Sequence, residues 1–153
     1  MNTYYPPTVV LSTMIDHVLV PMDDSPLARH ALEFALQAHP SAHVTVLHVV
    51  EHVDGRVGPE LLVGPEELRD RAEARAERLF DEARERAADH EGELTTVTRF
   101  GTPARVITEF ARDEDVDLVV IGCHGRRIVP QVLLGDVAQE VVRRASVPVT
   151  VVR

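Results

Sequence analysis

Three glycines and one acid stand together in the stretch GCHGRRIVPQVLLGD, residues 122–136. Gly122, Gly125 and Gly135 free the backbone for close approach, and a helical pattern begins directly after the last of them. Glycines beside a helix N-terminus are typical of a loop that holds phosphate groups. Asp136 argues against that chemistry, because its carboxylate stands where an anion would lie. The stretch therefore predicts either a phosphate cradle or a capped helix over an empty or repurposed cleft.

Asp136 also has a structural interpretation that needs no ligand. As an N-cap acid with Gln139 three residues later, it predicts an arrangement close to a capping box. Such a cap stabilises a helix by about 1 kcal/mol relative to alanine. A phosphate oxygen about 4 Å from the carboxylate would meet repulsion on the order of 4 kcal/mol at an effective dielectric of about 20. Arg126 or Arg127, a bridging Mg²⁺ or molar salt could offset that repulsion, so both interpretations stay open.

Other reactive residues favour neither catalysis nor metal binding. Cys123 and His124 are adjacent on an extended backbone, so their side chains point to opposite faces. No pair among the eight histidines shares a helical face, which disfavours a metal site. Asp23 and Asp24 follow the first strand, as in response-regulator receiver domains, but receivers need a lysine that this chain lacks.

Alternating strands and helices must position the glycine loop. The patterns predict strands over 15–22, 43–50, 94–100, 117–122 and 147–152, with helices over 26–38, 65–88, 103–114 and 136–145. This order predicts an α/β fold of the Rossmann-like kind. It is a single doubly wound five-stranded parallel sheet in the order 3-2-1-4-5, with helices on both faces. The ligand crevice should lie at the carboxyl ends of the first and fourth strands.

Two helices carry clear patterns. The first should begin with Ser25 as N-cap and Pro26 at the first helical position. Its expected apolar stripe consists of Leu27, Ala31, Phe34, Ala35 and Ala38. The second carries charges opposite its stripe, with Glu67–Arg71 and Glu82–Arg86 at i,i+4 spacing. We interpret this charged face as a solvated surface.

Composition narrows the function further. A chain of 153 residues fits one domain, and its net charge is −9. All 16 basic residues are arginine, and an acidic surface without lysine disfavours nucleic-acid and anionic-membrane partners. The bias indicates a protein from a salt-rich cytoplasm, or alternatively a GC-rich genome. A single cysteine fits a reducing cytoplasm, and no apolar run approaches the roughly 18 residues of a membrane span.

Several blocks resemble the universal stress protein family in the order that the family has them. They are VLVPMDDS, LHVV, TPARVITEFARDEDVDLVVIG, GCHGRR and LLGDVAQEVVRRASVPVTVVR, within 15–152. Nucleotide-binding members carry G-x2-G-x9-G followed by Ser or Thr, so the glycine spacing matches and Asp136 departs from it. The resemblance implies a nucleotide site made of Pro21, Met22, Asp23, Val49, Ile121, Gly122, Gly125, Arg126, Gly135, Asp136 and Val137.

The resemblance also implies a cytoplasmic homodimer that binds ATP or another adenine nucleotide as a stress-response sensor or regulator. Mg²⁺ could accompany the nucleotide. The last strand is an apolar edge that a second copy would cover, through Val147, Val149, Thr150, Val151 and Val152. The expected source is a halophilic archaeon, with residues 1–13 as a tail before a domain at 14–153.

The alternative is a dimeric interaction or chaperone-like stress protein that binds no nucleotide. A slow ATPase is less favoured, because the loop offers no evident general base for water.

Overall fold

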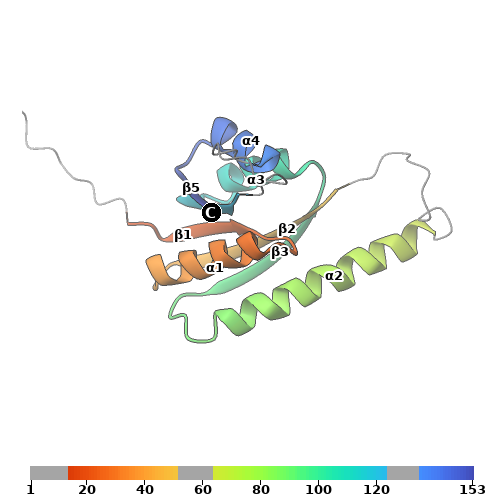
Figure 1. Ribbon diagram of the computed structural model, residues 1–153, viewed down its shortest axis with the longest axis horizontal. Helices are drawn as coiled ribbons and strands as arrows, with labels where there is room; N and C mark the ends of the chain where they lie inside the picture. The colour runs from red at the N-terminus through yellow and green to blue at the C-terminus, as the bar shows by residue number, and fades with distance from the viewer. Residues whose placement is uncertain (1–13, 52–63, 124–134) are drawn as a thin grey trace, which may run out of the picture.

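The fold is a five-stranded parallel sheet between two layers of helices (Figure 1). The computed structural model describes residues 14–51, 64–123 and 135–153. The sheet order β3-β2-β1-β4-β5 confirms the predicted fold. The strands are β1 (His17–Pro21), β2 (His43–Val50), β3 (Leu94–Phe100), β4 (Leu118–Gly122) and β5 (Val149–Val152), and the helices are α1 (Pro26–Ala38), α2 (Pro65–Arg86), α3 (Pro103–Asp113) and α4 (Asp136–Arg144).

Alternation along each strand divides the core into two clusters. Val18 and Val20 of β1 pack with the buried residues of α1 and α2, whereas Leu19 packs with those of α3 and α4. Successive side chains of a strand point to opposite faces of a sheet, so each strand supplies both layers. This double burial explains why β4, with sequence LVVIG, is apolar and buried throughout.

Helix α1 begins as predicted but buries a different stripe. The Ser25 hydroxyl accepts a hydrogen bond from the Ala28 N–H at 3.1 Å, which confirms the N-cap. Phe34 is 42% exposed, so its predicted place in the core is wrong. The buried positions are instead Ala28, Ala31, Leu32 and Ala35. The start of the helix lies close to β4, since a Cβ added to Gly122 would lie 2.6 Å from the backbone of Leu27.

Helix α2 is packed over its second half and exposed over its first. Its buried residues are Ala76, Leu79, Phe80 and Ala83, while residues 65–71 and 73–75 are exposed. An ion-pair network fixes the packed half to α1: Arg29 Nε lies 2.6 Å from Glu82 Oε1, and Arg86 pairs with both Glu33 and Glu82. The predicted pairs Glu67–Arg71 and Glu82–Arg86 are confirmed. The interpretation of this charged face as mere solvated surface is wrong, because part of it binds α1.

Candidate functional site

A large cavity opens at the carboxyl end of the sheet, with a volume of about 1380 Å³. It lies where the crevice was predicted, beside the ends of β1 and β4. Its lining includes these residues predicted for the nucleotide site: Pro21, Met22, Asp23, Val49, Ile121, Gly122, Gly135, Asp136 and Val137. The other two, Gly125 and Arg126, lie outside the described residues, as does Arg127.

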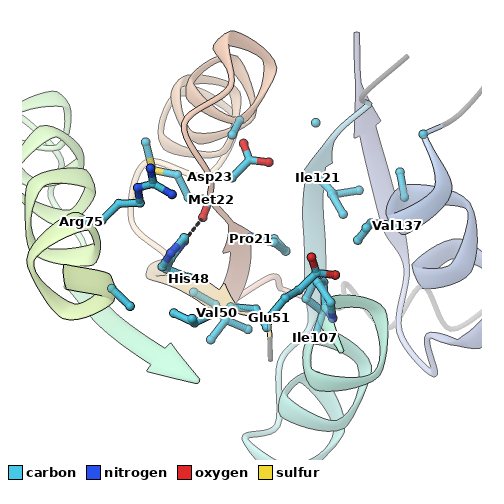
Figure 2. A pocket seen from close by; sticks show the side chains of 18 of the residues that line it. Pro21, Met22, Asp23, His48, Val50, Glu51, Arg75, Ile107, Ile121 and Val137 are labelled. Carbon is cyan, nitrogen blue, oxygen red and sulfur yellow. Dashed lines mark hydrogen bonds between the residues drawn. The ribbon is translucent and has the colours of Figure 1, made fainter. Parts of the chain in front are cut away.

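The cavity has two halves, because the strands that end there point side chains to both faces. Val49 and Ile121 pack toward α3 and α4, together with Ile107 of α3. Met22 packs toward α1 and α2. Figure 2 shows Arg75 of α2 and Val137 of α4 on opposite sides of the strand ends. We call the two parts the α4 half and the α2 half.

Asp136 is the first residue of α4 and does not cap it. Gly135 is the N-cap, no side chain makes a capping hydrogen bond, and the Gln139 N–H bonds the Gly135 carbonyl at 2.9 Å. The predicted capping box is therefore wrong. With glycine at the cap, the acid stands one position further along, where its charge still favours the helix dipole. No side chain within the described residues takes up the first N–H groups of α4, which leaves a donor-rich edge in the cavity lining.

Gly122 serves the fold as much as the cavity. A side chain there would meet the Leu27 carbonyl carbon and oxygen at 2.6 Å and the Ala28 nitrogen at 3.0 Å. The position therefore accepts no Cβ unless α1 moves away from β4. This glycine would be needed even in a chain without a ligand.

The turn after β1 is held rigidly by its own hydrogen bonds. Met22 N–H donates to the Leu47 carbonyl at 2.8 Å, and Asp23 Oδ1 accepts from the Ser25 N–H at 2.9 Å. His48 Nδ1 donates to the Met22 carbonyl at 2.9 Å, as Figure 2 shows. These bonds fix Met22 and Asp23 against the cavity, so the turn is preorganised for a ligand.

Among the lining residues that sequence reasoning missed are Ile107, His48 and Arg75. Ile107 and His48 were available from strand and helix periodicity, because each lies on a face turned toward the cavity. Arg75 could not be found that way, since the pattern of α2 does not tell how far the helix extends past the sheet. No cluster of three metal-ligating side chains occurs in the part of the chain that the structure describes.

The sequence matches the model of the universal stress protein family over residues 14–153. This chain belongs to the universal stress protein family. A universal stress protein of Thermus aquaticus is 34% identical over 149 residues, which covers 92% of this chain and 100% of that protein.

Two solved structures of the family show the same fold. One is of a Methanocaldococcus jannaschii protein, superimposed with a TM-score of 0.76 at 26% identity over 91% of this chain and 96% of that one. The other is the universal stress protein of Archaeoglobus fulgidus in complex with dAMP. Its TM-score is 0.57 at 25% identity, and the match covers 92% of this chain and 99% of that one.

Along the described ranges, no helix is long and apolar enough to cross a membrane.

Proposed function

We propose that this universal stress protein binds an adenine nucleotide in the cavity and acts as a cytoplasmic stress-response sensor or regulator, not as a dedicated enzyme. The observation that carries the proposal is the cavity itself, which joins an apolar half to an uncapped helix N-terminus. The Archaeoglobus fulgidus relative of the same fold forms a complex with dAMP. Adenine nucleotides need both of these features, a surface for the base and donors for the phosphates.

The α4 half offers the surface for the base. Pro21, Val49, Ile107 and Ile121 line it with apolar atoms. An adenine ring placed there would bury its faces against side chains that the core already holds in place. Asp23, fixed by the Ser25 N–H, presents a carboxylate at the rim that can accept hydrogen bonds from ribose hydroxyls.

The phosphates would meet the N-terminus of α4. The N–H groups there are not taken by the Asp136 side chain, so they remain for an anion. The Asp136 charge still repels a phosphate nearby, and its exposure to water weakens that repulsion. A bridging Mg²⁺ would reduce the repulsion further, as would molar salt. We propose a halophilic cytoplasm for this acidic chain, whose basic residues are all arginine.

We also propose a homodimer formed through β5, which is an edge strand of the sheet. The Pro148 and Val152 carbonyls accept from β4, so the backbone groups of Val149 and Val151 point away from the sheet. The side chains of Val147, Val149 and Val151 pack on the α3/α4 cluster, and that of Val152 packs on the α1/α2 cluster. The outward backbone groups of β5, together with half-buried Thr150 and its neighbours, form the proposed interface.

Calorimetric titration with ATP and AMP in molar KCl, with and without Mg²⁺, tests the nucleotide proposal. We expect both ligands to bind the wild-type protein. If neither binds the wild type or the Asp136→Ser variant, the nucleotide proposal is wrong, and a dimeric interaction protein becomes the better explanation.

For the dimer, Val151→Pro removes an outward N–H while sparing the bonds to β4. Sedimentation should show the mass falling from dimer to monomer, and a variant that stays dimeric would exclude the β5 interface.

A further inference from the structure

The α2 half of the cavity carries all the arginines among the described lining residues. Arg71, Arg75 and Arg78 come from consecutive turns of α2, at i, i+4 and i+7. Residues at this spacing share one face of a helix, so the three side chains point to the same side. The acidic Asp136 lies across the cavity on α4. The cavity is therefore polarised, with its cations on α2.

These arginines are only weakly engaged by the protein. Arg71 Nη2 lies 3.2 Å from Glu67 Oε1, and Arg75 Nε lies 3.7 Å from Asp24 Oδ2. Both pairs are exposed, and exposed ion pairs add little stability. Arg78 makes no ion pair or hydrogen bond with any described residue. A ligand anion would therefore displace few protein contacts.

His48 also lines the α2 half of the cavity. The residue is 9% exposed, and its Nδ1 is committed to the Met22 carbonyl. Its Nε2 has no partner among the described residues. Because no buried side-chain nitrogen or oxygen among the described residues lacks a partner, Nε2 is accessible to water. Figure 2 shows the ring on the same side of the strand ends as Arg75.

The cavity also has room for such a ligand beside a nucleotide. Its volume of about 1380 Å³ exceeds the roughly 300–1,000 Å³ that small-molecule sites usually need. Arg71 and Arg78 are about 10 Å apart along the helix axis at 1.5 Å per residue. A row of that length suits an extended anion with several charged groups better than a single carboxylate.

We propose that the α2 half of the cavity is an oligophosphate subsite, in which Arg71, Arg75 and Arg78 bind the phosphate oxygens. Guanidinium groups suit phosphate because their fork of donors matches its oxygens. The oligophosphate could be free or could be the phosphate chain of a nucleotide. The subsite goes beyond the proposed function, since it needs no adenine.

Tripolyphosphate, which carries no base, is the direct probe. Calorimetry should show it binding the wild-type protein, with affinity about tenfold lower in the Arg75→Gln/Arg78→Gln variant. Arg69→Gln/Arg84→Gln is the matched control, because it removes the same charge from the same helix at positions outside the cavity lining. Its affinity should stay within about twofold of wild type, since distant exposed charges are screened.

Two outcomes overturn the proposal: no binding of tripolyphosphate to the wild type, or equal weakening in the two double variants. Parallel titrations with ATP and adenosine separate the sources. A fall in ATP affinity in the Arg75/Arg78 variant identifies a nucleotide's phosphate chain, and an unchanged ATP affinity identifies a free oligophosphate. Failure of adenosine, AMP and ATP to bind would refute the proposed function alone.

A second measurement needs no variant and so is independent of variant folding. Phenylglyoxal modifies accessible arginines, and mass spectrometry locates the modified positions. Tripolyphosphate should protect Arg75 and Arg78 while leaving Arg69 and Arg84 reactive. Equal protection at all four positions would mean nonspecific ion association and would overturn the subsite.

Discussion

The two ends of the sheet differ in how completely their polar groups are satisfied. At the amino end, Asp117 Oδ2 accepts from the backbone N–H groups of Asp16 and His17 at 3.0 and 2.9 Å. His90 Nε2 donates to the Ala42 carbonyl at 2.8 Å, which closes the same end. At the carboxyl end, the N-terminus of α4 has no side-chain cap and Arg78 has no polar partner among the described residues.

The difference separates stability from binding. The polar groups at the amino end are hydrogen-bonded within the protein, so they hold the strands in register and are not available to a ligand. The polar groups at the carboxyl end that lack a partner within the protein contribute little to folding stability, and a ligand can bind them. Substitutions at the amino end should therefore change unfolding, and those at the carboxyl end should change binding.

Gly122→Ala is the expected exception, because it should lower stability although it lies at the carboxyl end. Its effect on the free energy of unfolding should be the largest of the substitutions described. Gly122 lies at the carboxyl end, yet a Cβ there would overlap the Leu27 backbone. Overpacking against backbone should destabilise the protein by about 3 kcal/mol. Urea unfolding measures the loss, with Gly64→Ala as control because nothing lies within 4 Å of its added Cβ. Equal midpoints for the two variants would contradict the close α1–β4 contact.

Asp117→Ala should lower stability by about 2 kcal/mol, because two backbone N–H groups lose a charged acceptor. Binding of ATP or tripolyphosphate should not change, since Asp117 lies at the other end of the sheet from the cavity. Chemical unfolding and calorimetry on the same sample measure both. Asp113→Ala is the control, because its carboxylate contacts only the exposed Arg112 among the described residues. A loss of affinity in folded Asp117→Ala would argue that the two ends are coupled.

Asp136→Ser should strengthen ATP binding about tenfold at low salt, because it removes a charge beside the α4 N-terminus. The gain should shrink in molar salt, where screening acts over about 3 Å. Stability should change little, since Asp136 makes no capping hydrogen bond. Asp89→Ser, on an exposed turn, controls for net charge. An equal gain from both variants would remove any local role for Asp136.

The smallest expected effect is a pH dependence at the amino end. The rings of His17 and His43 stack with centroids 4.5 Å apart, and each Nε2 contacts a threonine hydroxyl. Burial, with repulsion from His43, lowers the pKa of His17 below its usual 6.5, although Asp117 and Glu114 act in the opposite direction. The unfolded chain therefore binds this proton more readily than the folded one. The stability contributed by neutral His17 is complete above pH 6.5 and is lost as pH falls through the lowered pKa.

Urea midpoints at about pH 7.5 and about pH 5.5 test this dependence. His17→Gln should reduce the difference between the two midpoints, and His30→Gln, at an exposed position of α1, should not. Identical differences in wild type and His17→Gln would assign the pH dependence elsewhere.

Periodicity predicted the sheet well because buried parallel strands are apolar on both faces. The bounds of β2 and β3 match the expected 43–50 and 94–100, and Pro65 and Pro103 begin helices as predicted. The misplaced Phe34 shows the limit. Helical spacing identifies the apolar positions, but the packing of α1 on the sheet decides which of them are buried, and it buries Leu32 in place of Phe34.

The position of the site was predictable from the sequence, but the arrangement of its charged groups was not. Strand order located the cavity, since ligands of doubly wound sheets bind where the order reverses. The helix pattern could not tell that α4 starts at Asp136 with Gly135 as its cap, because one residue decides between cap and first turn. Nor could it show that the exposed part of α2 lines the cavity and brings its surface arginines there.

Helix α2 is anchored to the rest of the domain mainly along its second half. Leu79, Phe80 and Ala83 seat its second half in the core, and Glu82 fastens it to α1. The exposed first half has weaker contacts, such as the Arg69 guanidinium 5.5 Å from the centre of the Phe100 ring, so we expect it to tilt more easily than the packed half. Arg78 lies next to the packed half and Arg71 lies in the exposed half, so an anion bound by both would restrain the exposed half relative to the packed one. An anion bound at the carboxyl end of the sheet would thereby limit how far the exposed end of this helix, about 33 Å long, can move.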